Sequence, residues 1–78
     1  MSKIALSQTC AGDACVVLDI DARQDELRNR LFVLGVIPGS LIRVLRFAPL
    51  GDPIQIKVGA SLISIRKSEA QMVSVEVQ

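Results

Sequence analysis

Two cysteines and an aspartate lie close together near the start of this chain of 78 residues, at Cys10, Asp13 and Cys15. Two thiolates and a carboxylate would suit zinc better than ferrous iron. A tetrahedral structural zinc site usually draws four side-chain ligands, however, and this group offers three. We therefore favour the interpretation in which Cys15 packs at the start of a strand and Cys10 lies in a turn. We predict no metal and no cofactor, and keep these three residues as candidate ligands.

Few other residues in this sequence could take part in catalysis. The chain has no histidine, so imidazole supplies neither a metal ligand nor a general base near neutral pH. Nucleophiles of the Cys/His and Ser/His types are excluded for the same reason. We predict a protein that is not an enzyme.

Charge and hydropathy limit which partners the chain can have and where in the cell it can work. Nine basic and eight acidic residues give a formal charge of +1, and the basic residues are scattered without a run. We therefore expect no nucleic-acid partner. No apolar stretch approaches the roughly 20 residues that span a bilayer, so no direct membrane insertion is expected. Polar residues 7–9 interrupt the apolar opening before a signal-peptide core can form, and we expect a cytoplasmic protein with one domain over residues 1–78.

The elements that must position these residues are mainly strands. Short β-branched and alternating segments bounded by turn residues predict five strands. These segments cover residues 14–20, 40–47, 53–58, 61–66 and 73–77. In the second segment apolar residues occupy both parities, so the sequence leaves open which face is inward. A bent strand shared between two sides of a barrel would explain that pattern.

One helix is predicted around residues 22–34, between the first two strands. Leu27, Leu31 and Leu34 recur at helical spacing and form one buried face. Phe32 and Val33 fall off that face, so the apolar surface of the helix is broader than a single contact with a barrel requires. We take these two residues as one candidate partner-binding surface.

Glycine and proline define the turns. Gly35 supplies a left-handed residue after the helix, and Pro38 prevents its continuation. Pro38 and Gly39 fit the central positions of a type II turn. Gly59 and Ala60 fit a two-residue type II′ hairpin. Short strands joined by tight turns predict a mainly β fold, a small SH3-like barrel of about five strands with the helix inserted.

Three ordered pieces of the sequence resemble the ferrous iron transport protein A (FeoA) family. The pieces are Arg30-Leu31 and Leu34-Gly35 with Pro38-Gly39, then residues 48–53 (Ala-Pro-Leu-Gly-Asp-Pro), then residues 63–67 (Ile-Ser-Ile-Arg-Lys) with Glu69-Ala70. The structural motif of the resemblance comprises Leu31, Leu34, Gly35, Pro38, Gly39, Pro53 and Arg66. The pair Cys10 and Cys15 is no part of it.

The resemblance implies an SH3-like barrel and a cytoplasmic accessory protein of bacterial ferrous iron uptake. It implies a partner, a large membrane ferrous iron transporter that carries its own GTPase domain, and neither an enzyme nor a strong iron site. The alternative is a metal-sensing or regulatory module, since metal-dependent repressors carry a similar barrel as an appended domain. Exposed edges of a small open barrel make weak homo-oligomers a further expectation.

The loop over residues 48–53 is the other candidate partner-binding surface, through Pro49, Leu50, Gly51 and Asp52. Its two prolines make it stiff, so little entropy is lost on binding, and Leu50 at the tip would be an apolar anchor. Two alternatives stay open. Leu50 would fold back over an open end of the barrel, and Asp52 would serve the turn by accepting hydrogen bonds from backbone N–H groups.

Overall fold

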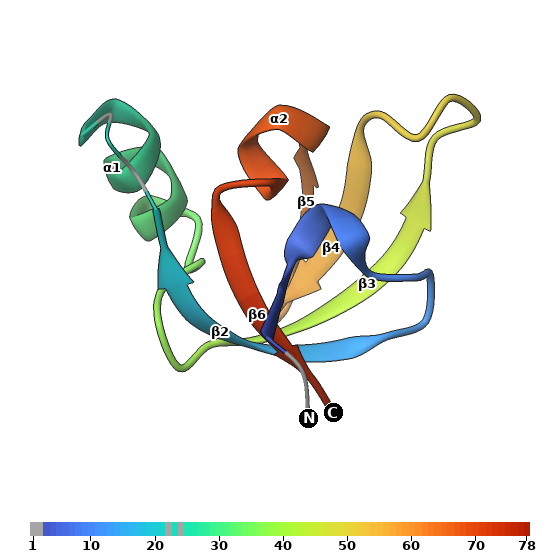
Figure 1. The fold of residues 1–78 in the computed structure, drawn as a ribbon, viewed down its shortest axis with the longest axis horizontal. Helices are drawn as coiled ribbons and strands as arrows, with labels where there is room; N and C mark the ends of the chain where they lie inside the picture. Colours follow the sequence, from blue (N-terminus) through green and yellow to red (C-terminus); the bar gives the residue numbers. More distant parts are fainter. Residues whose placement is uncertain (1–2, 22, 24) are drawn as a thin grey trace.

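A computed structural model describes residues 3–21, 23 and 25–78 of the chain (Figure 1). In chain order the elements are β1 (Lys3–Ala5), the 3-10 helix η1 (Leu6–Gln8), β2 (Ala14–Ile20), α1 (Asp25–Val33), β3 (Leu41–Phe47), β4 (Ile54–Val58), β5 (Ser61–Ile65), α2 (Lys67–Ala70) and β6 (Val73–Val77). The predicted mainly β fold class with an inserted helix is confirmed.

All six strands form one antiparallel sheet in the order β1-β6-β2-β3-β4-β5. The sheet bends strongly (Figure 1), and β2, which lies between β6 and β3, pairs with β6 from Cys15 to Ile20 but with β3 only from Ala14 to Val16. Register shifts between Val17 and Asp19 in β2 and between Val44 and Arg46 in β3 accompany the bend, as β-bulges do. This order leaves β1 and β5 as the two edge strands.

The bulge in β3 explains which of its side chains face inward, a question that the sequence left open. Ile42 and Val44 are buried before the shift, whereas Leu41 and Leu45 are exposed. After the shift Phe47 packs against the core from its partly buried position. One extra residue in the strand switches the inward-facing positions from even-numbered to odd-numbered residues. Apolar residues are therefore needed at both kinds of position.

A sixth strand, β1, was absent from the five-strand prediction. It pairs with β6 through Ile4 opposite Val75. Three residues are too few to show a recognisable alternation of apolar and polar side chains. Pairing with a distant segment, and not local pattern, makes this segment a strand.

The helix α1 is shorter than the predicted range of 22–34. It begins at Asp25 and ends at Val33, and residues 22 and 24 lie outside the described residues. Leu31 is fully buried, and Leu27 and Leu34 pack against the core from partly buried positions. The predicted apolar face is therefore confirmed, although only its central leucine is sealed from solvent.

Gly35 ends α1 in the predicted left-handed conformation, with φ +89°. The N–H of Val36 donates to the carbonyl of Leu31 at 2.8 Å, and the N–H of Gly35 donates to that of Phe32 at 3.0 Å. This pair of bonds is a Schellman motif, and the side chains of Val36 and Leu31 at its two ends are both buried in the core. The chain is thereby turned back onto the barrel.

The next turn is the predicted type II turn. Gly39 has φ +92°, and the N–H of Ser40 donates to the carbonyl of Ile37 at 3.0 Å. Ser40 itself precedes the ladder, which begins at Leu41. The Oγ of Ser40 donates to the carbonyl of Gly35 at 2.8 Å, so the two turns are tied together.

The core is aliphatic and forms one cluster. Strands contribute most of it, and η1, α1, α2 and the segment after α1 supply the rest. The buried apolar residues are Leu6, Cys15, Val17, Ile20, Leu31, Val36, Ile42, Val44, Ile54, Ile56, Ile63, Ile65, Ala70, Val73 and Val75. Among the described residues, no helix is long and apolar enough to cross a membrane.

Candidate interaction surfaces

Leu50 stands at the tip of a closed turn and is 95% exposed. The N–H of Gly51 donates to the carbonyl of Ala48 at 2.6 Å, and the N–H of Ala48 donates to the carbonyl of Pro53 at 3.0 Å. Pro49 occupies the second turn position, where its fixed φ is favoured. The alternative in which Leu50 folds back over the barrel is wrong.

Asp52 carries a structural bond in this loop. Its Oδ1 accepts a hydrogen bond from the N–H of Lys67 at 3.0 Å, and the peptide bond that joins it to Pro53 is cis. Lys67 opens α2, whose first N–H groups lack partners within the helix. Asp52 thus accepts from the backbone, as expected of a turn residue, but the N–H belongs to a distant segment. The loop and α2 are joined through it.

Phe32 and Val33 form a second exposed apolar surface at the end of α1. Their exposed fractions are 64% and 81%. Figure 1 shows α1 and the loop of residues 48–53 at opposite sides of the molecule. The structure therefore does not unite the two predicted partner-binding surfaces, and a partner that used both would have to reach across the barrel.

The three candidate metal ligands do not form a cluster. Cys10 is exposed, whereas Cys15 is fully buried among apolar side chains. Asp13 accepts a hydrogen bond from the N–H of Cys10 on its Oδ2 at 2.8 Å. Burial raises the pKa of the Cys15 thiol, and the nearby Asp13 charge raises it further. Across the described part of the chain, no three His, Cys, Asp or Glu side chains are arranged to hold a metal ion.

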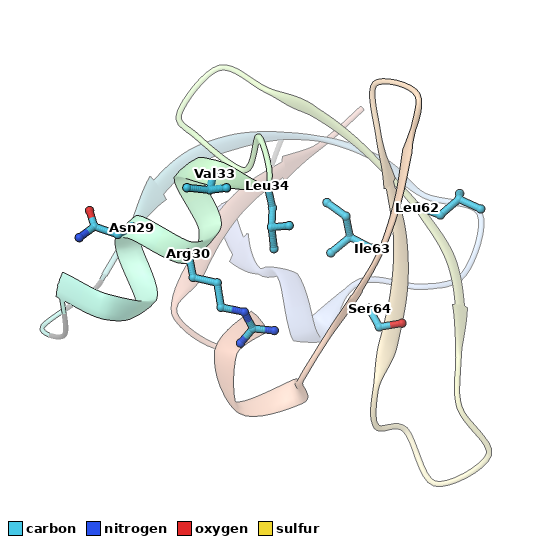
Figure 2. Close-up of a pocket in the computed structure, with 7 residues that line it drawn as sticks. All are labelled: Asn29, Arg30, Val33, Leu34, Leu62, Ile63 and Ser64. Carbon is cyan, nitrogen blue, oxygen red and sulfur yellow. The ribbon is translucent and has the colours of Figure 1, made fainter.

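A groove of about 550 Å³ that the sequence did not reveal lies between α1 and β5 (Figure 2). Asn29, Arg30, Val33 and Leu34 line it from the helical side, and Leu62, Ile63 and Ser64 line it from the strand. The two walls are some thirty residues apart in the chain, so no local pattern connects them. The available signal was Leu62, an apolar residue on the outward parity of a predicted strand.

A second cavity, of about 630 Å³, lies between α1 and α2 and is lined mainly by charged side chains. Arg30 borders both cavities, and its guanidinium forms a salt bridge with Glu69. Glu69 also accepts from the N–H of Arg66 on its Oε1 at 3.0 Å. This ion pair connects the two helices, and both of its residues line the polar cavity.

The sequence match decides the family. The model of the FeoA domain matches residues 4–77 of the chain. The chain belongs to the FeoA family. The resemblance that the three motif pieces indicated is therefore confirmed, and it links the chain to ferrous iron transport.

Relatives of known sequence and structure agree with this membership. A fusion protein of Porphyromonas gingivalis, which joins Fe(2+) transport protein A to the Fe(2+) transporter FeoB, is 31% identical over 72 residues. That match covers 92% of this chain and 8% of the fusion protein. The crystal structure of an iron uptake regulatory protein, FeoA, is 32% identical with a TM-score of 0.88, and each chain is covered in full.

The SH3-like character of the fold is also confirmed. The FeoA of Stenotrophomonas maltophilia, a prokaryotic SH3 domain protein in complex with zinc, is 29% identical with a TM-score of 0.81, covering 94% of this chain and 89% of that one. A manganese-dependent transcriptional repressor shares the fold at 18% identity and a TM-score of 0.92, where this chain covers 42% of the repressor. The second likeness concerns the fold alone.

Proposed function

We propose that this chain is a cytoplasmic, non-enzymatic accessory protein of bacterial ferrous iron uptake, a single FeoA-like unit over residues 1–78. It binds the cytosolic side of a membrane ferrous iron transporter with a GTPase domain and modulates the assembly or activity of that transporter. The observation that carries this proposal is the P. gingivalis fusion, which places an FeoA sequence and an FeoB transporter in one polypeptide. Fusion raises the effective concentration of two partners.

The chemistry of the chain supports a binding role. Without histidine it lacks the usual general base, and the buried Cys15 thiol is held in its protonated, unreactive form. What the molecule presents instead is exposed aliphatic and aromatic surface. Isolated apolar residues on a surface need no explanation, but Leu50 is offered by a turn whose geometry does not require leucine.

The contact surfaces proposed for the transporter are the loop tip at Leu50 and the end of α1 at Phe32 and Val33. The loop is closed by two backbone hydrogen bonds and stiffened by Pro49. A preorganised apolar anchor loses little conformational freedom on binding. A short loop of this type is therefore suited to insert its leucine into a pocket of the partner.

Co-purification with the transporter tests the proposal. Leu50→Asp and Phe32→Asp each place a charge in a contact that we expect to be desolvated, and we expect at least one to weaken binding about tenfold or more. Leu41→Asp is the matched control, since Leu41 is 61% exposed on β3 and lies outside both surfaces. Retention of wild-type binding by both variants would remove these surfaces from the proposal, and failure of the wild-type chain to bind would remove the partner.

Calorimetry with ferrous iron and with zinc separates this function from a metal-sensing one. We expect no tight stoichiometric binding of either ion, because Cys15 is buried whereas Cys10 is exposed. The control is a chain with Cys10→Ser and Cys15→Ser. Tight binding that this double variant abolished would replace the accessory function with the metal-sensing one.

A further inference from the structure

The edge strand β5 carries unused backbone hydrogen-bonding groups. Val58 and Ser61 close the two-residue hairpin, and such a closing pair is hydrogen-bonded. Bonded and non-bonded pairs alternate along an antiparallel ladder, so Leu62 and Ser64 turn their N–H and C=O groups away from β4. Within the described residues, no strand lies beyond β5 and no turn or loop bond occupies these groups.

These same two residues border the groove beside α1. Figure 2 shows the side chains of Leu62 and Ser64 pointing away from α1, whereas Ile63 and Leu34 point toward one another. Leu62 and Ser64 therefore border the groove with their backbone. The groove combines an apolar floor with a row of free donors and acceptors along one wall, which is the arrangement that an added strand occupies in β-augmentation.

The charges near β5 indicate what kind of segment could bind along this edge. Residues 41–67 contain five basic residues and one acidic residue, and that acidic residue, Asp52, is bonded to the N–H of Lys67. Arg43 lies directly opposite Lys57, which lies directly opposite Leu62. Like charges placed opposite each other destabilise a sheet, and neither cation forms a salt bridge with a described residue. An anionic partner would neutralise this row.

We propose that the free edge of β5 binds an extended, acidic segment of a partner polypeptide as an additional strand. Its inward side chains pack on Ile63, Leu34 and Val33, and its outward carboxylates lie next to Leu62, on the same face of the sheet as Arg43 and Lys57. This goes beyond the proposed function, because it concerns how the chain binds a polypeptide and holds whether or not the transporter supplies that segment.

Amide hydrogen exchange followed by NMR tests the proposal with a defined probe, an acetylated and amidated peptide of alternating glutamate and valine. Because their N–H groups point away from β4, we expect the amides of Leu62 and Ser64 to exchange fast in the free protein and about tenfold more slowly at nine-tenths occupancy. The amides of Ile63 and Ile65 already bond to β4 and change less. A peptide of alternating lysine and valine is the matched control, and we expect it to give no protection.

Variants separate backbone pairing from surface contact. Leu62→Pro removes one outward N–H without removing a ladder bond to β4, and we expect it to weaken binding of the glutamate peptide about tenfold or more. Leu62→Glu is the second variant, since it leaves the backbone unaltered and sets a like charge opposite the carboxylates of the peptide, and we expect it to weaken binding of the glutamate peptide as well. Leu50→Asp keeps the edge intact, so its loss of transporter binding with full peptide binding would keep the two proposals distinct.

Three results would overturn the inference. They are no protection of Leu62 and Ser64 at millimolar glutamate peptide, equal protection by the lysine peptide, and protection in concentrated protein without any peptide. The last result would identify a second copy of this chain as the occupant.

Discussion

Gly35 ends α1 in a backbone conformation that side-chain-bearing residues adopt at a cost. Its φ of +89° lies in the left-handed region, where a Cβ crowds the following carbonyl oxygen. A Cβ built on Gly35 would also lie 3.4 Å from Cγ1 of Val58, which is ordinary van der Waals contact. The cost of a substitution there is therefore one of backbone strain and not of collision.

We predict that Gly35→Ala lowers the free energy of unfolding by about 1–2 kcal/mol. Gly35→Asn is the matched variant, because asparagine enters the left-handed region more readily, and it should cost clearly less. Urea denaturation of the three proteins measures both differences. Equal losses in the two variants would show that packing, and not φ, controls this position.

The buried thiol of Cys15 should make the stability of the fold depend on pH. Burial and the Asp13 charge raise its pKa in the folded state, so the unfolded chain loses the thiol proton first as the pH rises. The stability gained from the protonated thiol is present below the unfolded pKa, roughly 8.5, and is lost as the pH rises through the folded pKa. We predict that the free energy of unfolding falls as the pH rises above about 8.5, and that Cys15→Ala reduces the slope of this fall with pH. Cys10→Ser should keep the slope, and a slope unchanged in Cys15→Ala would contradict the assignment.

At the scale of elements, the segment formed by β1 and η1 closes one side of the barrel. Leu6 is fully buried, and its carbonyl accepts from the Oγ1 of Thr9 at 2.7 Å. Ile4 packs against the core while β1 pairs with β6. A segment of six residues thus completes a core that the other strands leave open.

We predict that Leu6→Ala costs about 2–5 kcal/mol in the free energy of unfolding, as large-to-small changes in a packed core do. Leu50→Ala deletes the same atoms from a side chain that is 95% exposed and should change stability by less than about 0.5 kcal/mol. Thermal and urea denaturation compare the two. A small loss for Leu6→Ala would mean that β1 and η1 are not part of the cooperative unit.

At the scale of the whole molecule, a formal charge of +1 conceals an uneven distribution. The segment from β3 to the start of α2 is strongly basic, and the remainder carries the acidic excess. In the part of the chain that the structure describes, all buried apolar residues belong to one cluster. The uneven charge bears on the choice of partner, since a basic face favours an acidic one. The single core bears on how the chain unfolds.

We predict that the chain unfolds in one cooperative transition, because a small chain with one core has no second unit to unfold separately. Calorimetry should give equal calorimetric and van't Hoff enthalpies, and circular dichroism and NMR should report the same midpoint. Leu6→Ala should lower the midpoint without splitting the transition. Two separate transitions in the wild-type chain would contradict the single-domain assignment.

Local physics made most of the elements predictable. Gly35, Pro38 and Gly39 each have a backbone preference that identifies its turn without reference to the rest of the chain. The alternation in β4 and β6 identifies their inward faces in the same way. The strand β1 escaped prediction because the strand with which it pairs, β6, lies some seventy residues away. The start of α1 was misplaced because helix signals define ends to within a few residues.

The sequence by itself determined the fold class, the turns, the absence of histidine chemistry and the membership of the FeoA family, because each depends on residue type and order along the chain. Only the tertiary structure decided that Leu50 projects from its loop, that Cys15 is buried while Cys10 is exposed, and that β5 is left as an edge beside α1. Exposure, burial and unused backbone groups depend on which distant segments pack together. Strand order sets that packing, and it is a property of the whole chain.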